Sequence, residues 1–151
     1  MMQLRRTDAT HKDFIQLVKD LDAYLKTVDG DDHAFYAQYN TLEYIQHVII
    51  AYENDLPVGC GAIKAYNPDA VEVKRMFTLP EVRGKGVAST ILTALENWAN
   101  ELGYTKCILE TGKKQVEAIG LYQKKNYHIV PNYGPYNGVE NSICFEKSLN
   151  T

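Results

Sequence analysis

This chain of 151 residues lacks the sequence features that are typical of membrane, secreted and repeat proteins. No apolar run approaches the length of about 20 residues that a membrane-spanning helix needs. Residues Met1 to Arg6 lack the apolar segment of a secretory signal, and no repeat or low-complexity segment occurs. We therefore expect a soluble, cytoplasmic protein without a membrane partner, folded as one domain over residues 1–151.

Cysteine is scarce, and Cys60, Cys107 and Cys144 lie far apart in segments that we expect to be strands. An odd count without a C-x-x-C pair argues against a disulfide framework. No second histidine or cysteine lies beside His33 at the spacing of a zinc site, so we expect no metal. Buried, reduced thiols are the favoured interpretation of the cysteines, and a catalytic cysteine is the alternative.

An excess of basic residues is also missing, because 16 lysines and arginines stand against 19 acidic residues. Domains that bind nucleic acids usually carry a basic patch, so this balance predicts no nucleic-acid partner. The hydrophobic share of 45% is ordinary for a globular protein. A chain of this length buries roughly 70% of its unfolded surface, which is enough for a substantial core.

The most informative stretch of the chain runs from Val82 to Ser89. It follows a β-rich segment at 71–78, and apolar residues recur after it at intervals of three and four as far as Leu102, which is typical of an amphipathic helix. The free amides and the dipole at a helix N-terminus attract anions. Gly84 and Gly86 permit close approach of a ligand, so the stretch predicts a phosphate site.

The glycine spacing narrows the kind of phosphate ligand. Neither the three-glycine dinucleotide fingerprint nor the P-loop pattern is present, so ATP or a dinucleotide bound in those ways is not expected. An ordinary turn that opens a helix is the alternative interpretation.

Strand and helix patterns alternate through the chain. We expect strands at 3–7, 46–52, 57–66, 71–78, 106–111, 127–133 and 142–147, and helices at 12–27, 34–40, 87–102 and 115–125. Asp8 or Thr10 is the expected cap of the first helix. Short turns favour an antiparallel meander of the second to fourth strands. The strand–helix–strand unit at 71–111 requires a right-handed crossover and parallel pairing, so the predicted fold class is α/β with a mixed sheet.

Two segments resemble motifs of the GNAT superfamily of acyl-CoA-dependent N-acetyltransferases. Residues 83–88 fit its R/Q-x-x-G-x-G/A signature, and residues 121–127, Leu-Tyr-Gln-Lys-Lys-Asn-Tyr, are similar to its later L-Y-x-K-x-G-F segment. The resemblance extends from about Ile49 to Leu149. It implies a twisted, mostly antiparallel sheet of about seven strands with helices on both faces, and acetyl-CoA as co-substrate.

The resemblance also implies where coenzyme A would bind. Its pantetheine arm would pair with the edge of a splayed strand, and its pyrophosphate would bind the glycine loop and the helix start. The implied cofactor-binding residues are Met76, Phe77, Thr78, Arg83, Gly84, Lys85, Gly86, Val87, Ala88, Ser89, Gln115, Tyr122 and Lys125. Gln115 replaces the asparagine of many members, and Asn126 replaces a common glycine whose left-handed conformation asparagine tolerates.

The chemistry of acyl transfer suggests catalytic roles. A lysine-type amine has a pKa of ~10.4, so it must lose a proton before it attacks a thioester. The resemblance places Tyr122 near the CoA sulfur, where its phenol would protonate the leaving thiolate as a general acid. Glu72 and Glu110 are candidate bases, with a water-mediated base as the alternative. Each of these three side chains also has an ordinary structural interpretation.

The acceptor site is predicted mainly from an acidic, aromatic stretch after the first helix. The candidate substrate-binding residues are Asp31, Asp32, His33, Tyr36, Glu110 and Tyr133. Carboxylates there would attract a cationic amine, whereas the alternative is a solvated loop with helix-capping aspartates. We expect the acceptor to be a primary amine of a small molecule, amino acid or peptide. A non-catalytic acyl-CoA-binding module is the alternative function, and a homodimer is an open expectation because many family members pair.

Overall fold

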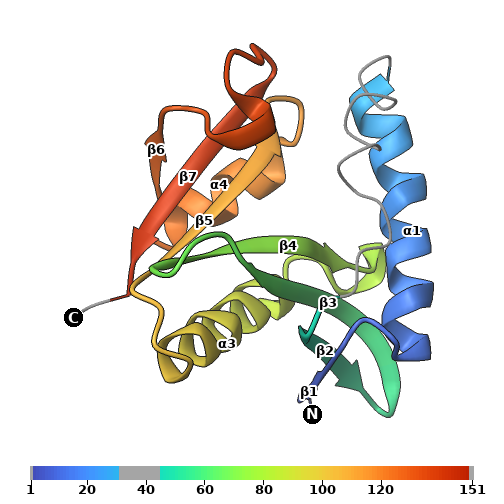
Figure 1. The fold of residues 1–151 in the computed structure, drawn as a ribbon. Coiled ribbons are helices and arrows are strands. Elements are labelled where there is room, and N and C mark those ends of the chain that lie inside the picture. The colour runs from blue at the N-terminus through green and yellow to red at the C-terminus, as the bar shows by residue number, and fades with distance from the viewer. Residues whose placement is uncertain (1, 31–44, 150–151) are drawn as a thin grey trace.

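A single mixed sheet organises the computed structural model, which describes residues 2–30 and 45–149. Its strand order within this part of the chain is β1-β2-β3-β4-β5-β7-β6 (Figure 1). The strands are β1 (Met2–Thr7), β2 (His47–Glu53), β3 (Leu56–Ala65), β4 (Ala70–Thr78), β5 (Lys106–Gly112), β6 (His128–Val130) and β7 (Ser142–Ser148). Only β4 and β5 pair in parallel among these strands. The expected mixed, mostly antiparallel sheet is therefore confirmed.

Helices cover both faces of the sheet, as expected. They are α1 (Lys12–Asp29), α3 (Val87–Glu101) and α4 (Val116–Lys124), and α1 and α3 lie on opposite sides of β2 to β4 in Figure 1. The apolar stripe of α1 buries Phe14, Leu17, Val18 and Leu21 in one core, with Val48 and Ile50. The stripe of α3 and part of α4 pack into the other core, with Ile49, Val71 and Val73. Spacings of three and four residues produce these stripes.

The helix α3 packs closely on the sheet because β3 has glycine beneath it. A Cβ on Gly61 would lie 2.5 Å from Met76 Sδ and 2.9 Å from Leu95 Cδ1. Real Cβ atoms do not approach other atoms so closely, so a larger residue would push α3 away from β3. Gly61 is therefore a point of close packing between β3 and α3.

A β-bulge interrupts β4 opposite Gly61. Cys60 pairs with Phe77 and Ala62 pairs with Lys74, so Arg75 and Met76 together oppose one residue of β3. Arg75 has a φ of 60°, which is left-handed and unusual for a residue other than glycine. The bulge shifts the alternation of side chains along the strand. Val73 therefore packs in the core beneath α3, whereas Phe77 packs in the core beneath α1.

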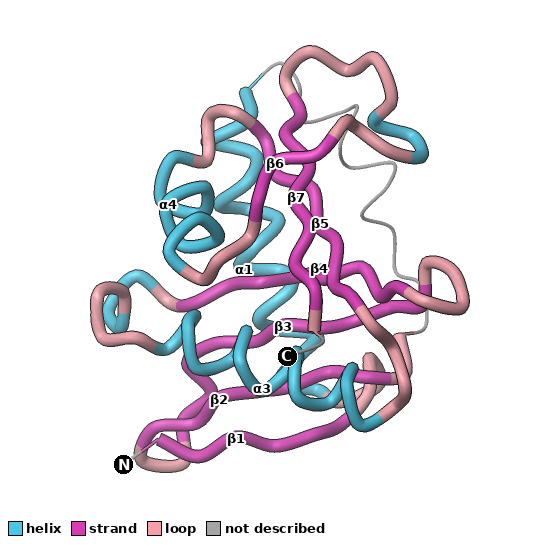
Figure 2. Tube along the Cα trace, turned by 90° about the vertical axis from the view of Figure 1, so that its left-hand side faces the viewer, coloured by secondary structure: helices cyan, strands magenta, loops and turns pink. Residues whose placement is uncertain are grey.

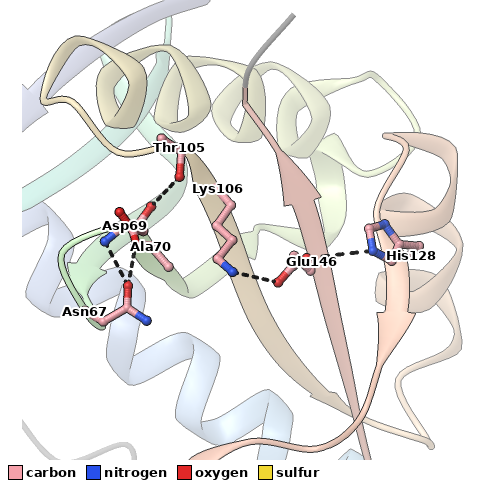
Figure 3. A network of polar contacts seen from close by, with 7 residues as sticks. All are labelled: Asn67, Asp69, Ala70, Thr105, Lys106, His128 and Glu146. Carbon is pink, nitrogen blue, oxygen red and sulfur yellow. Dashed lines mark hydrogen bonds and ion pairs between the residues drawn. The ribbon is translucent and has the colours of Figure 1, made fainter.

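The parallel pair of β4 and β5 is joined at one end only. Pairing covers Ala70–Lys106 to Glu72–Ile108 and stops there. At the paired end, which we call the closed end, Asn67 Oδ1 accepts hydrogen bonds from the amides of Asp69 (2.9 Å) and Ala70 (2.8 Å). The carbonyl of Asp69 accepts bonds from the Thr105 amide and hydroxyl (Figure 3).

Beyond the closed end, β4 and β5 diverge. In Figure 2, β1 to β4 run across the view, whereas β5 and β7 cross them steeply. The free edge of β5 pairs with β7 from Lys106 to Gly112, and the Lys106–Glu146–His128 contacts continue this support toward β6 (Figure 3). The two strands therefore leave a gap at residues 73–78 and 109–112, which we call the open end.

Some expected boundaries were wrong. The strand expected at 127–133 is limited to His128–Val130, because Pro131 has no amide to donate to a ladder. The cap of α1 is His11, whose Nδ1 accepts from the Asp13 amide at 3.1 Å. Asp8 does not cap the helix, because its Oδ1 accepts a hydrogen bond from the Thr10 amide, which lies before the start of α1. The helix expected at 34–40 lies outside the described residues.

The expectations for the cysteines and for Asn126 were right. Cys60, Cys107 and Cys144 are free and buried, and Asn126 adopts the left-handed conformation expected after α4, with a φ of 73°.

No helix in the described ranges is long and apolar enough to span a bilayer. In the same ranges, no group of three or more acidic, histidine or cysteine side chains is arranged to hold a metal ion.

Candidate functional site

Two cavities meet at the open end of the β4–β5 pair. The larger, which we call the loop cavity, has a volume of about 340 Å³ and lies among β4, the loop before α3, and α4. The smaller, which we call the charged cavity, has a volume of about 100 Å³ and lies among α1, β4 and the end of β5. Four residues line both, namely Leu21, Met76, Gln115 and Tyr122. These side chains mark the junction of the two cavities.

The loop before α3 is shaped to receive an anion. Gly84 and Gly86 both have a φ of 81°, a left-handed conformation that favours glycine. No atom lies within 4 Å of where their Cβ atoms would be, and both residues line the loop cavity. Gly86 is the N-cap of α3, so no side chain covers the first amides of the helix. These amides are therefore available to a phosphate group.

The side chain of Arg83 joins this loop to α1 and β4. Its guanidinium carbon lies 4.6 Å from the ring centre of Tyr24 and 5.9 Å from that of Phe77. Its Nε also donates to the carbonyl of Thr78 at 3.4 Å. Stacking on aromatic rings holds an arginine in place while it keeps its charge. Arg83 therefore adds a fixed positive charge to the wall of the loop cavity.

The remaining predicted cofactor residues divide into two groups. Met76, Phe77, Thr78, Val87, Ala88, Ser89 and Gln115 line the loop cavity with the residues above. Since pairing with β5 stops at Glu72, the backbone of β4 at Met76 to Thr78 has one edge without a strand partner in the described structure. Lys85 and Lys125 do not line the cavity, and Lys125 Nζ instead donates to Thr93 Oγ1 at 2.6 Å.

Tyr122 is the polar aromatic residue at the junction of the cavities. It lies in the last turn of α4, and its ring packs at 5.8 Å from that of Tyr127 and 5.9 Å from that of Phe145. Burial raises the pKa of Tyr122 well above its ordinary value, and the charge of Glu110 raises it further. The hydroxyl therefore keeps its proton at neutral pH and is available as a donor.

Glu72 lies in the charged cavity and is bound by Tyr133. The Tyr133 hydroxyl donates to Glu72 Oε2 at 2.8 Å, and Lys74 Nζ lies 3.9 Å from Oε1. Burial and the neighbouring Glu72 carboxylate raise the pKa of Tyr133, which keeps this hydroxyl a donor. Two residues predicted separately, one as a base and one as a substrate contact, are thus brought together. This contact could not be predicted from the sequence, because the two residues are 61 positions apart in the chain.

Glu110 and Thr111 complete the polar wall formed by β5. Both line the charged cavity together with Tyr122. The Thr111 hydroxyl is buried and has no hydrogen-bond partner in the described part of the chain. A buried polar atom without a partner costs free energy, so this hydroxyl is suited to a ligand.

Sequence reasoning missed several residues of the site. Arg75 and Tyr136 line the charged cavity, and Tyr24 of α1 lines the loop cavity. Arg75 was missed because the bulge adds a residue to β4, opposite Gly61 of β3. Tyr24 was missed because α1 approaches β4 only through the fold. Four predicted acceptor residues, Asp31, Asp32, His33 and Tyr36, lie outside the described residues.

Comparisons with known proteins agree with this geometry. Residues 14–127 match the model of the acetyltransferase (GNAT) family. The chain is 34% identical over 143 residues to an "IAA acetyltransferase" of Azospirillum brasilense, covering 89% of this chain and 90% of that protein.

Solved structures give the same answer for the fold. A Klebsiella pneumoniae protein assigned as an acyl-CoA N-acyltransferase superposes with a TM-score of 0.83, with 28% identity over 99% of both chains. A GNAT family acetyltransferase from Elizabethkingia anophelis, crystallised with acetyl-CoA, superposes with a TM-score of 0.69, with 18% identity over 97% of both chains. From its fold, its glycine loop and the match over most of its length, the chain belongs to the GNAT family of acetyltransferases.

Proposed function

We propose that this protein transfers the acetyl group of acetyl-CoA to a primary amine. The observation that carries the proposal is the position of Tyr122, which lines both the loop cavity and the charged cavity. Coenzyme A in the first cavity and an amine in the second would meet at this hydroxyl. A relative whose structure contains acetyl-CoA has the same fold, which supports the assignment of the first cavity.

The loop cavity fits the chemical parts of coenzyme A. The pyrophosphate would bind the first amides of α3 around Gly84 and Gly86, beside the charge of Arg83. The amides of the pantetheine arm would pair with the free edge of β4 at Met76 to Thr78. Coenzyme A supplies an acetyl group activated as a thioester, and the residues around it supply position, protons and exclusion of water.

Tyr122 provides the proton that the leaving sulfur needs. As the amine nitrogen bonds to the acetyl carbon, the carbon–sulfur bond breaks and its electron pair stays on sulfur. The Tyr122 hydroxyl, which is protonated at neutral pH, donates its proton there. Tyr122 regains a proton from the new amide nitrogen, directly or through water. The products are the N-acetyl amine and the free thiol.

Glu110 is the proposed base for the acceptor because it lines the charged cavity with Tyr122, whose pKa its charge raises. Glu72 lines the same cavity, where it accepts a hydrogen bond from Tyr133 and lies beside Lys74. An ammonium group at Glu110 would lose its proton to the carboxylate next to the thioester. Glu72 and Tyr133 would then bind the acceptor.

The proposed activity is tested by the release of free thiol from acetyl-CoA with a panel of amines. We expect amine-dependent release, together with calorimetric binding of CoA but not of ATP or NAD. CoA binding without thiol release with any of the acceptors would favour a non-catalytic acyl-CoA-binding module. Glu110→Gln should lower kcat more than Glu72→Gln does, and the reverse order would assign the base to Glu72.

The role of Tyr122 is tested by Tyr122→Phe, which removes one oxygen from the junction. We expect kcat to fall by about 100-fold, as for other general acids, with the dissociation constant of CoA unchanged. Tyr127→Phe is the matched control, because Tyr127 is also buried but lines neither cavity, and its hydroxyl donates a hydrogen bond to Glu96 at 2.9 Å. Equal turnover in wild type and Tyr122→Phe would remove the tyrosine from the mechanism.

A further inference from the structure

The Thr111 hydroxyl is a buried polar group that contributes no hydrogen bond to the fold. Thr111 lies on β5 with 4% of its surface exposed, and its Oγ1 has no hydrogen-bond partner within the described ranges. Valine differs from threonine only by a methyl group in place of the hydroxyl, and it would fill this position without an unsatisfied polar atom. Groups that destabilise the free protein in this way are typical of functional sites.

Thr111 and Tyr122 reach the charged cavity from the same face of the sheet. The pairing of β5 with β7 is regular over Lys106–Gly112, so the side chains of β5 alternate between the two faces. Cys107 and Leu109 lie in the same core as Tyr122, and Thr111 continues this row along the strand. Both Thr111 and Tyr122 line the charged cavity, so a ligand at its junction with the loop cavity would have a hydroxyl from each.

The acetyl group is the part of acetyl-CoA that would reach Thr111. Thr111 lines the charged cavity but not the loop cavity, whereas Tyr122 lines both. In the proposed function the sulfur lies at Tyr122, so the acetyl group extends past it into the charged cavity to meet the amine. Its carbonyl oxygen accepts hydrogen bonds and has no proton to donate, whereas a threonine hydroxyl donates one.

We propose that the Thr111 hydroxyl donates a hydrogen bond to the carbonyl oxygen of the acetyl group during transfer. This inference rests on the proposed acetyltransferase function and adds a catalytic residue to it. When the amine nitrogen bonds to the carbonyl carbon, one electron pair of the C=O bond moves to the oxygen, which becomes negative. The pair returns as the carbon–sulfur bond breaks. The proton of Thr111 stays on its own oxygen throughout.

Burial makes such a hydrogen bond effective. A donor that is fixed in a buried wall needs no reorganisation when negative charge develops beside it. Loss of one donor of this kind lowers kcat by about 10²–10³-fold in enzymes. The same burial leaves the hydroxyl without a partner until a ligand arrives. The hydroxyl of Thr111 should therefore have opposite effects on stability and on turnover.

The main test is Thr111→Val, which replaces the hydroxyl with a methyl group. We expect kcat in the thiol-release assay to fall by about 100-fold, by the same factor for every amine that is acetylated. The KM of the amines and the dissociation constant of CoA should stay nearly unchanged. The melting temperature of the free protein should rise by about 2–4 °C, because an unsatisfied polar atom is removed. Thr111→Ser keeps the donor and should keep most of the turnover.

Thr105→Val is the matched control, at the closed end of the β4–β5 pair. The Thr105 hydroxyl donates to the carbonyl of Asp69 at 3.2 Å, and Thr105 lines neither cavity. Its loss should lower the melting temperature slightly and leave kcat as in wild type. This pattern is the opposite of the one expected for Thr111→Val.

Binding of two unreactive analogues tests the carbonyl contact without an acceptor. One is the ketone analogue of acetyl-CoA in which a CH₂ group replaces the sulfur, and the other is S-ethyl-CoA, which has no carbonyl. By calorimetry, we expect wild type to bind the ketone up to about tenfold more tightly than Thr111→Val does, the equivalent of one hydrogen bond. Both proteins should bind S-ethyl-CoA equally.

Each outcome decides a different question. Wild-type kcat in Thr111→Val, or equal affinity of both proteins for the ketone, would overturn the inference and leave the acetyltransferase function standing. A loss confined to the KM of the amines would assign the hydroxyl to the acceptor and overturn it too. A fall in the melting temperature of Thr111→Val would show that the hydroxyl has a partner in the free protein, which removes the premise. If no amine releases thiol with the wild-type protein, the proposed function fails and the inference fails with it.

Discussion

The closed and open ends of the β4–β5 pair differ in how their polar groups are used. At the closed end, the turn at Asn67 to Ala70 and the Thr105 backbone satisfy one another through short hydrogen bonds. At the open end, the strands part and their polar groups line two cavities. The first end is held by hydrogen bonds within the chain, whereas at the second the buried Thr111 hydroxyl has no partner in the described part of the chain. Changes at the two ends should therefore affect different measurements.

The largest difference is expected from a substitution in the loop at the open end. Gly86→Val introduces a branched side chain at a left-handed φ of 81°, at the helix N-terminus proposed to bind pyrophosphate. We expect the dissociation constant of CoA to rise by more than about 100-fold, as measured by calorimetry. Gly103→Val is the matched control, because Gly103 has a φ of 94° at the other end of α3. Similar affinity losses in both variants would show that strain, and not the site, is responsible.

A smaller difference is expected between thiols at the two ends as the pH rises. Burial raises the pKa of Cys107, which pairs with β4 at the closed end, to about 12, and that of Cys144, opposite Glu110, to about 11. The ordinary value is 9.0, so the folded state keeps protons that the unfolded state releases. The stability from these thiols is complete below pH 9 and is lost as the pH rises toward 11 and 12.

The same values predict an order of chemical modification. Cys144 should form a thiolate at a lower pH than Cys107. Alkylation of the native protein across pH 9 to 11, followed by peptide mass spectrometry, measures this order. Faster labelling of Cys107 would contradict the assigned difference between the two environments.

The smallest effect is expected at the closed end itself. Asn67→Ala removes the oxygen that accepts from the Asp69 and Ala70 amides, so we expect a loss of about 1 kcal/mol in the free energy of unfolding. Denaturant titration measures this loss, and CoA affinity should stay as in wild type. Asn137→Ala, in an exposed loop position, serves as the control. A large drop in CoA affinity for Asn67→Ala would show that the two ends are coupled.

The fold was largely predictable because its signals are local. The stripe at Phe14, Leu17 and Leu21 and the spacing after Val87 each identify a helix and its buried face. Short turns predicted the antiparallel pairing of β2 with β3 and of β3 with β4. The rule for crossover connections predicted the parallel pairing of β4 with β5. The cap of α1 was missed because Asp8, His11 and Thr10 compete over a few residues, and only their hydrogen bonds show which one caps the helix.

The candidate site was predictable where a motif fixes the backbone and not where distant segments meet. The glycine loop and Tyr122 were identified from short motifs, and both line the cavities. The Glu72–Tyr133 hydrogen bond joins positions on different strands and loops, so no sequence spacing encodes it. Arg75 was missed because a strand pattern assumes regular alternation, whereas a bulge adds one residue that the pattern does not count.

That additional residue has a consequence for how the strand tolerates shortening. Without Arg75, Met76 would stand directly opposite Gly61, between the existing partners Lys74–Ala62 and Phe77–Cys60. Val73, Met76 and Phe77 would each still face their present cores. A chain shortened by this one position would thus have a continuous ladder and an unchanged interior. The protein therefore carries, within its central sheet, one residue that its architecture could do without.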